Sequence, residues 1–386
     1  MRCLLGASRD PGQASATLPR GGIHKILICR TVHTLGDSLT LTPLLQELSE
    51  IYPGAEIDVI NGSAVAGEIY GKFFSVRRIF QLPARAVRHP LRTVRVIRAM
   101  RRNHYDLVID PDPESQSGRL LALLADAAHS LGFSGPKKSG ELTHEVAIPD
   151  EPRHKGTLPV YLVRSAIGDV AAQRAYPRLD IRLSAAERRQ GRHILDRLRR
   201  QPDPTRLKGT IGIYAFATGD KNLGSAWWNR FLRVFEPAAA GYAIVEILPA
   251  FGCSPLGSRH AGFFSSDIRK LASVLGNLGL YISADCGVMH LASAAGAPTI
   301  GIFTSTPLWE WSPYGHANRA IDARNLTPER VAATILAILG IEVPIPRSEN
   351  AMQAPLLPAM RASFGMEENL RGAQSAQQPL PQASPR

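Results

Sequence analysis

The chain has 386 residues, more than one hydrophobic core usually organises, so we expect two folded domains. The apolar fraction is 44%, and no apolar segment approaches the ~20 residues that cross a bilayer, which excludes a transmembrane class. The net charge of +12 predicts an acidic partner, which is nucleic acid, anionic lipid or a phosphorylated substrate.

The first domain is predicted to begin, after a flexible leader at residues 1–21, with a strand at 24–30. The apolar spacing over 38–51 predicts a helix, and residues 56–60 form the next buried strand. This strand–helix–strand unit predicts the start of a doubly wound parallel sheet. No G-x-G-x-x-G follows the first strand, which argues against a standard dinucleotide site there.

Residues 77–102 hold nine arginines and no acidic residue. We expect a helix here with arginines on one face, while Leu91, Val94 and Ile97 form its apolar side. Such a helix suits an anionic membrane surface, and the alternative is a solvated helix face. Nucleic acid is disfavoured because no aromatic residues interleave for base stacking. The residues assigned to the acceptor or membrane are Arg77, Arg78, Arg88, Arg92 and Arg95.

The connection between the domains is predicted within residues 150–210, where Pro and Arg accumulate. We place the first domain at residues 22–180, the second at 181–340 and a disordered tail at 341–386. Further strands are expected at 105–110, 210–216 and 243–248, and further helices at 118–129, 184–200, 226–238, 266–275 and 327–339.

The stretch at residues 279–303 is predicted to be a strand, a turn, a short helix and a second strand. Gly296 ends the helix, and its free N-terminal amides favour an anion. Asp285 and His290 stand at this terminus, which indicates a phosphate-bearing ligand. The alternative is a plain crossover in which Asp285 caps the helix and His290 is a satisfied core histidine.

Three loops of the two domains are expected to line one cleft between them. The loop at residues 33–37 supplies Asp37, and the loops at 218–222 and 284–290 supply a cationic, amide-rich pocket. A carboxylate opposite such a pocket is the arrangement needed to attack a sugar bound to a diphosphate leaving group. The alternative role for Asp37 is a helix cap, which stabilises by ~1 kcal/mol.

Residues 26–60, 105–110 and 279–303 resemble glycosyltransferase family 9, the heptosyltransferases of lipopolysaccharide core assembly. The resemblance covers most of residues 23–340. It implies a GT-B fold, in which two Rossmann-like doubly wound domains face each other across a cleft. It also implies inverting transfer, with no metal and no cofactor, of a heptose-like sugar. The donor is ADP-heptose or a similar nucleotide sugar, and the acceptor is a lipopolysaccharide core or lipid A-type glycolipid.

By the same resemblance, Asp37 is the catalytic base and Lys221 neutralises the departing diphosphate. A free Asp is a weak base at neutral pH, so we expect Leu35 and Leu39 to help by burying it. The residues implied in donor binding are Thr218, Asp285, Cys286, Gly287 and His290. The chain departs from the family at Cys286, where Ser or Thr is usual, at Val288, where Pro is common, at residues 303–306, and in lacking an acid within 248–255.

The expected partners are thus a nucleotide sugar, a phosphorylated glycolipid and the anionic inner face of the cytoplasmic membrane, with no nucleic acid. Four cysteines without metal-site spacing fit a reducing cytosol. One alternative is a metal site at Asp110 and Asp112, a D-x-D at a strand end. Another is a non-catalytic protein of the same fold that binds a nucleotide sugar or an anionic glycolipid.

Overall fold

The computed structural model of the chain describes residues 17–83, 86–151, 153–169, 174–199, 208–315 and 317–343. Residues 1–16 of the predicted leader and 344–386 of the predicted tail lie outside these ranges. Within them, no helix combines the length and the apolarity that crossing a membrane requires.

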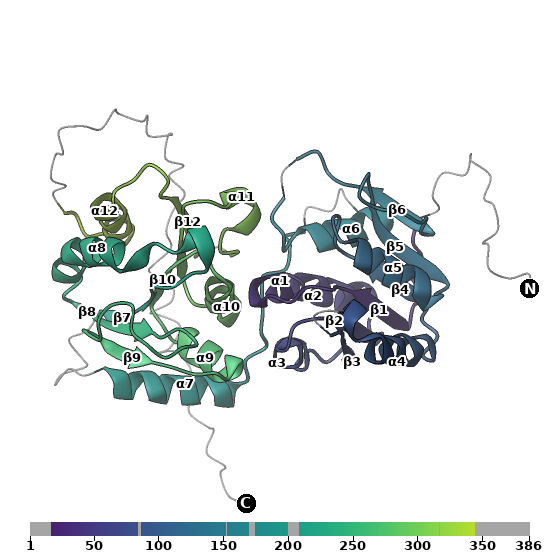
Figure 1. The fold of residues 1–386 in the computed structure, drawn as a ribbon, viewed down its shortest axis with the longest axis horizontal. Helices are drawn as coiled ribbons and strands as arrows, with labels where there is room; N and C mark the ends of the chain where they lie inside the picture. The colour runs from purple at the N-terminus through teal and green to yellow at the C-terminus, as the bar shows by residue number, and fades with distance from the viewer. Residues whose placement is uncertain are drawn as a thin grey trace, which may run out of the picture. The chain divides into compact units, whose positions relative to one another are not determined.

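Two parallel six-stranded sheets carry the fold (Figure 1). Their strand orders are β3-β2-β1-β4-β5-β6 and β12-β11-β10-β7-β8-β9. In each sheet the chain adds strands first on one side and then on the other. The change of side, the switch point, lies between β1 and β4 in the first sheet and between β7 and β10 in the second. A ligand crevice forms at such a switch point. The strands are β1 (Lys25–Cys29), β2 (Glu56–Asn61), β3 (Val76–Gln81), β4 (Leu107–Asp110), β5 (His129–Ser134), β6 (His144–Ala147), β7 (Gly209–Tyr214), β8 (Tyr242–Ile247), β9 (Ala261–Phe263), β10 (Leu280–Ala284), β11 (Thr299–Phe303) and β12 (Arg319–Asp322).

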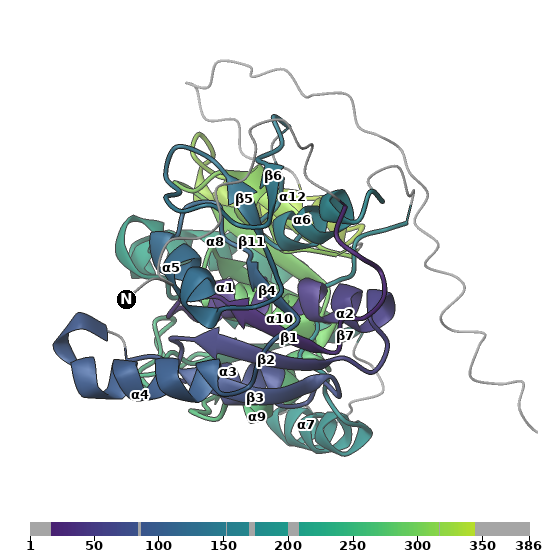
Figure 2. The same ribbon diagram turned by 90° about the vertical axis from the view of Figure 1, so that its right-hand side faces the viewer.

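Helices cover both sheets, and the described ones alternate with the strands along most of the chain (Figures 1 and 2). The helices near the first sheet are α1 (Leu35–Leu39), α2 (Thr42–Ile51), α3 (Ala66–Tyr70), the 3₁₀ helix η1 (Ala86–Arg88), α4 (Pro90–Arg101), α5 (Gln116–Ala125) and α6 (Leu158–Ala166). Those near the second are α7 (Ala185–Leu198), the 3₁₀ helix η3 (Gly219–Lys221), α8 (Gly224–Ala238), α9 (Ile268–Leu275), α10 (Gly287–Ala295), α11 (Leu308–Trp311) and α12 (Pro328–Ile338).

The predicted helix at residues 38–51 is wrong in one respect, because two helices, α1 and α2, occupy this region. Pro43 is the reason, since it has no N–H and its ring collides with the carbonyl four residues earlier in a continuous helix. Helix α1 also begins earlier than predicted, at Leu35, because Thr34 caps it, and Asp37 lies in its first turn. The side chains of Leu44 and Leu48 on α2 are fully buried in the core with Ile28 of β1, each worth about 1.5–3 kcal/mol.

The stretch at residues 279–303 folds as predicted into β10, α10 and β11. Gly296 ends α10 with a left-handed φ of 91°, which only glycine adopts without strain. Every residue of β10 and β11 is buried, as expected for central strands of a parallel sheet. The N-terminus of α10 therefore lies at the carboxyl end of β10, beside the switch point between β7 and β10.

The basic segment at residues 77–102 differs from the prediction in its first part. Arg77 lies on strand β3, and its guanidinium is bound by Glu56 and Asp58 at 2.7 Å each. It is therefore not available to an acceptor or a membrane. The acids that hold it come from β2, outside the segment, so the run of arginines alone could not reveal them.

Helix α4 forms the second part of the basic segment and lies beside β3 and α5 (Figures 1 and 2). Of the three residues predicted to form its apolar side, Leu91 and Val94 are 81% and 42% exposed. Ile97 alone packs against the buried core, where Met100 also lies. The side chains of Arg88, Arg92 and Arg95 are exposed around the two apolar residues. The outer face of α4 is thus both basic and apolar.

Arg269 at the start of α9 fixes the chain segment that leads into α7. Its guanidinium donates to the carbonyls of Ile181 and Arg182 at 3.0 Å each and to both carboxylate oxygens of Glu187 at 2.5 and 3.0 Å. Glu187 also completes the capping box of Ser184. The hydrogen bond from Arg269 is the main reason that the pKa of Glu187 falls to about 2.

We expect Glu187→Gln to destabilise the protein more at neutral pH than in acid. The lowered pKa means that the ionised carboxylate stabilises the fold fully above the unfolded value near 4.5, and that this contribution is lost as the pH falls through about 2. The loss at pH 7 should be about 1–2 kcal/mol, because the pair is partly solvated. Urea unfolding at several pH values measures it. Glu151→Gln, at an 88% exposed carboxylate, is the control and should change stability little at any pH.

Candidate active site

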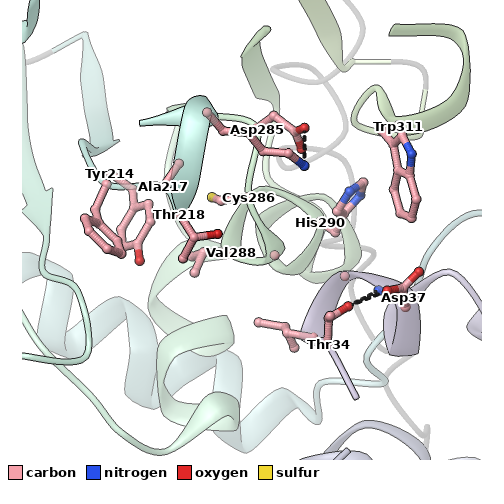
Figure 3. A pocket seen from close by; sticks show the side chains of 15 residues that line it. Thr34, Asp37, Tyr214, Ala217, Thr218, Asp285, Cys286, Val288, His290 and Trp311 are labelled. Atoms are coloured by element: carbon pink, nitrogen blue, oxygen red, sulfur yellow. Dashed lines mark hydrogen bonds and ion pairs between the residues drawn. The ribbon is translucent and has the colours of Figure 1, made fainter. Parts of the chain in front are cut away.

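A cavity of about 450 Å³ lies at the carboxyl ends of the central strands and is lined by loops of both sheets (Figure 3). One wall is the start of α1, from Thr34 to Asp37. The opposite wall combines the loop after β7 with the start of α10. Its lining residues are Thr34, Leu35, Gly36, Asp37, Tyr214, Phe216, Ala217, Thr218, Lys221, Asp285, Cys286, Gly287, Val288, His290 and Trp311.

Helices α1 and α10 approach each other through two glycines. A Cβ on Gly36 would lie 3.0 Å from Cδ2 of His290, and a Cβ on Gly287 would lie 3.1 Å from Cβ of Leu35. Both spaces are too tight for an added methyl group without local movement. This close packing of α1 against α10 brings Asp37 and His290 to the same cavity.

Asp37 does not cap α1, which rules out the alternative role predicted for it. The cap is Thr34, whose hydroxyl accepts from the Asp37 amide at 3.2 Å and donates to Oδ2 of Asp37 at 2.6 Å (Figure 3). Its Oδ1 lies 3.7 Å from the Arg30 guanidinium, and its side chain is 25% exposed. Of the two flanking leucines, Leu39 is fully buried whereas Leu35 is half-buried and lines the cavity. The carboxylate is therefore held in one orientation at the cavity wall.

Asp285 does not cap its helix either. The cap residue of α10 is Cys286, and it makes no capping hydrogen bond. Asp285 is buried and forms an ion pair with Lys221, at 2.8 Å between Oδ2 and Nζ (Figure 3). Thr306 also donates its hydroxyl to Oδ2. The loop after β7, the start of α10 and the segment after β11 are thereby tied together beside the free amides of α10.

His290 is buried but not satisfied, in contrast to the alternative predicted for it. Its Nδ1 has no hydrogen-bond partner among the described residues. Burial is the largest cause that lowers the pKa of His290 to about 4, so the imidazole is neutral near pH 7. A neutral imidazole can donate one hydrogen bond and accept another without adding charge to the cavity.

Cys286 lies at the N-terminal end of α10 with its thiol in the cavity wall (Figure 3). Burial raises the pKa of this thiol to about 11, so it remains protonated at neutral pH. Its Sγ donates weakly to the Ser283 hydroxyl at 3.9 Å. The residue therefore behaves as a small, weakly polar group rather than as a nucleophile.

The structure brings seven predicted site residues to this cavity, from three separate parts of the chain. They are Asp37, Thr218, Lys221, Asp285, Cys286, Gly287 and His290. The predicted arginines do not line it, since they lie on β3, η1 and α4.

The alternative metal site at Asp110 and Asp112 is already occupied by cations of the protein. Asp110 is bound by Lys138 at 2.6 Å and by Arg119 at 3.3 Å, and all three side chains are buried. Asp112 lies 3.2 Å from Arg30. Both carboxylates thus have cationic partners within the protein, which argues against a metal site at this motif.

Sequence reasoning missed the aromatic part of the cavity. Trp311 of α11 lines it beside His290, with ring centroids 6.0 Å apart, and Tyr214 and Phe216 line its other end. Phe251 packs edge-on against Phe216 at 5.0 Å. No periodic pattern marks these residues, although Phe216 ends the predicted strand at residues 210–216 and could have been placed at its carboxyl edge.

Residues 266–337 match glycosyltransferase family 9 (heptosyltransferase). The matched range includes α10 with Asp285 and His290, whereas Asp37 and Lys221 precede it. The predicted resemblance to this family is thereby confirmed. A search of curated proteins found no match to the sequence.

Three solved structures are similar to the whole described fold. The glycosyl transferase family 9 structure from Veillonella parvula DSM 2008 has a TM-score of 0.65 and 16% identity, covering 84% of this chain and 99% of that one. E. coli ADP-heptose LPS heptosyltransferase II has a TM-score of 0.62 and 18% identity, covering 82% and 98%. E. coli heptosyltransferase WaaC with ADP-2-deoxy-2-fluoro heptose has a TM-score of 0.60 and 18% identity, covering 82% and 99%.

At such identities the likeness establishes the fold. The predicted class, two Rossmann-like doubly wound units of the GT-B type, is confirmed by the two parallel sheets and by these structures. The family match and the three neighbours also support the predicted glycosyltransferase class.

Proposed function

We propose that this chain, which carries a glycosyltransferase family 9 match in its second half, is an inverting, metal-independent glycosyltransferase. The donor is a nucleotide diphosphate sugar such as ADP-heptose, which is also the ligand type named for the WaaC structure. The acceptor is a phosphorylated glycolipid of the lipopolysaccharide core or lipid A type.

One observation carries this proposal. A carboxylate that is not a helix cap, Asp37, and a cation held at a helix N-terminus, Lys221, line opposite walls of the same cavity. An acceptor hydroxyl and a diphosphate leaving group need groups of these two kinds on opposite sides of the reacting carbon.

In the proposed reaction, Asp37 takes the proton of the acceptor hydroxyl while that oxygen attacks the anomeric carbon. The bond from this carbon to the diphosphate oxygen breaks, and the leaving group departs as a nucleoside diphosphate. The attack comes from the face opposite the leaving group, so the anomeric configuration inverts. Thr34 supports this role because its hydroxyl donates to Oδ2 of Asp37 and so fixes the orientation of the carboxylate.

The donor would lie along α10 and the loop after β7. The amides of α10 and Lys221 offer positive charge for the diphosphate, and Thr218 and His290 offer neutral hydrogen bonds. Tyr214 and Phe216 provide an aromatic surface for a nucleobase. Cys286 places only a small side chain at the helix N-terminus, and Gly287 places none there.

Incubation of the protein with a panel of nucleotide sugars and a lipid A-type acceptor tests the function. We expect transfer from ADP-heptose in the presence of a chelator, read as the mass gain of the acceptor and as released ADP. Because a protein cation and helix amides supply the positive charge, chelation should change the rate less than twofold. Loss of the activity on chelation, restored by a divalent ion, would contradict metal independence. Nucleotide-sugar binding with no transfer to any acceptor would favour the non-catalytic alternative.

The proposal includes docking at the inner face of the cytoplasmic membrane through α4. On this helix Leu91 and Val94 are exposed among basic side chains, a combination that suits insertion at the level of anionic headgroups. Each basic residue near such a surface adds about 1 kcal/mol. The exposed basic residues proposed to contact the membrane are Arg88, Arg92 and Arg95.

Replacing these three arginines with Glu should weaken binding to anionic liposomes by about 100-fold or more, because at least ~3 kcal/mol of attraction is lost. Liposome co-sedimentation at low and moderate salt measures this. The control replaces three of the exposed arginines of α7, Arg189, Arg192 and Arg197, with Glu, which makes the same change in net charge. Equal weakening by both variants would mean that net charge, and not α4, governs the association.

A further inference from the structure

Arg30 joins Asp37 to a second carboxylate, that of Asp112. Arg30 follows β1 and Asp112 follows β4, and these adjacent strands border the switch point of the first sheet. One guanidinium nitrogen lies 3.2 Å from Oδ2 of Asp112, and another lies 3.7 Å from Oδ1 of Asp37. A single cation is therefore shared by two carboxylates, and the closer one is not the carboxylate that lines the cavity.

The shared guanidinium is enclosed. The side chain of Arg30 is 5% exposed, and its Nε has no hydrogen-bond partner among the described residues. Such burial of an arginine is costly unless nearby anions compensate its charge. The two carboxylates provide that compensation, so the arrangement depends on both of them.

Asp112 is held as a fixed anion. Burial alone would raise its pKa, but the charge of Arg30 and the hydrogen bond from the Glu114 amide, at 2.9 Å, outweigh burial and lower that pKa. Lys155 adds a further positive charge nearby. Asp112 therefore stays ionised across the neutral pH range and continues to attract the Arg30 guanidinium.

We propose that Arg30 and Asp112 are positioning residues for Asp37, with the guanidinium shared so that the Asp37 carboxylate is oriented yet remains able to take a proton. This inference rests on the proposed function. Arg30 alone would form a tight pair with Asp37 and weaken it as a base. Asp112 prevents this by drawing the cation toward itself and by adding a second negative charge. Neither residue lines the cavity, so neither is assigned a contact with substrate.

Other charged and titratable groups also face this position. Tyr70 of α3 lies near enough that both Arg30 and Asp37 affect its pKa, which burial raises. His290 of α10 contacts Gly36, next to Asp37, and is neutral near pH 7. Their charges do not change over the neutral range, so Arg30 and Asp112 are the groups whose substitution should alter the behaviour of Asp37.

The test compares Asp112→Asn with Arg30→Met through the pH dependence of kcat. In Asp112→Asn the Arg30 guanidinium interacts with Asp37 alone. The acidic limb of the pH profile of kcat should therefore move to lower pH by about one unit, and kcat should fall about tenfold. In Arg30→Met the attracting charge is lost, so the limb should move to higher pH. Arg30→Lys should stay close to the wild type, and the double variant should fall between the two single variants. The donor KM should change less than twofold throughout.

A purely structural role would lower kcat in both variants without moving the two limbs in opposite directions, and that result would overturn the inference. Glu114→Gln, on the same loop with its 61% exposed carboxylate paired to Lys137, is the control and should leave the profile unchanged. Thermal melting identifies any variant that fails to fold. If Arg30→Met fails, the double variant takes its place, and its limb should lie at higher pH than that of Asp112→Asn.

A second readout separates this inference from the proposed function. Protein labelled with ¹³C at aspartate carboxyls gives the titration of Asp37 by NMR, with Asp37→Asn assigning its signal. The midpoint should move to lower pH in Asp112→Asn even if no sugar donor is turned over. An unmoved midpoint would refute the positioning role, whereas a moved midpoint in a protein without transferase activity would refute only the proposed function.

Discussion

Replacing Asp37 with Asn is expected to lower kcat for glycosyl transfer by ~10²–10⁴-fold while leaving nucleotide-sugar binding nearly unchanged. The amide keeps the size of the side chain and can still accept from the Thr34 hydroxyl, so α1 should keep its fold. What is lost is a group that can take the proton of the acceptor hydroxyl. Single-turnover transfer, with donor affinity from calorimetry, measures the two effects separately.

The matched control for this variant is Asp126→Asn. Asp126 ends α5 with a left-handed φ of 54°, a conformation that Asn also tolerates, and it is exposed outside the cavity. The variant Asp126→Asn makes the same carboxylate-to-amide change and should leave kcat within twofold of the wild type. If Asp37→Asn behaves like this control, Asp37 is not the base. A non-catalytic binding protein would lose nothing measurable in either variant.

Local sequence patterns were sufficient to predict the strand–helix–strand unit at residues 279–303. Buried apolar runs define its strands, and Gly296 and Pro298 limit its helix, so every signal lies within the unit itself. The carboxyl edges of parallel strands then put Asp285 and the loop of Lys221 on one side of the sheet. Local propensity and sheet topology together are therefore sufficient to predict one wall of the cavity.

The other features depend on contacts between residues far apart in the chain. The fit of Gly36 against His290 joins positions that no periodicity connects, and it decides how near Asp37 comes to the second sheet. The same limit explains the error at Arg77, whose carboxylate partners lie on the neighbouring strand β2. A sequence segment rich in arginine does not indicate which acidic residues strand pairing will place beside it.

The sharing of Arg30 between two carboxylates could not have been predicted from the sequence for a related reason. Asp112 is part of a D-x-D that suggests a metal site when read alone, and only the folded position of Arg30 assigns it another role. Trp311 likewise reaches the cavity through the segment that follows β11. The Thr306 hydroxyl in this segment donates a hydrogen bond to Asp285. In both cases, the position of the side chain depends on contacts between segments that are far apart in the sequence.

Lys221→Met is the second substitution expected to have a large effect, with kcat/KM for transfer lowered by ~10²–10³-fold. The proposed cause is the loss of a positive charge beside the diphosphate as the bond to the sugar breaks. Lys270→Met, at a 70% exposed lysine of α9 outside the cavity, should change it less than twofold. Transfer rates with saturating acceptor and varied donor measure both variants.

The ion pair of Lys221 with Asp285 complicates this result, because Lys221→Met also leaves a buried carboxylate without its cation. That uncompensated charge would itself repel a diphosphate. The double variant Lys221→Met with Asp285→Asn separates the two causes. If Lys221 served only to neutralise Asp285, the second change would remove the repulsion and return most of the rate. If Lys221 stabilises the leaving group directly, the double variant should remain at least as slow as Lys221→Met, since removing Asp285 does not return a positive charge to the cavity.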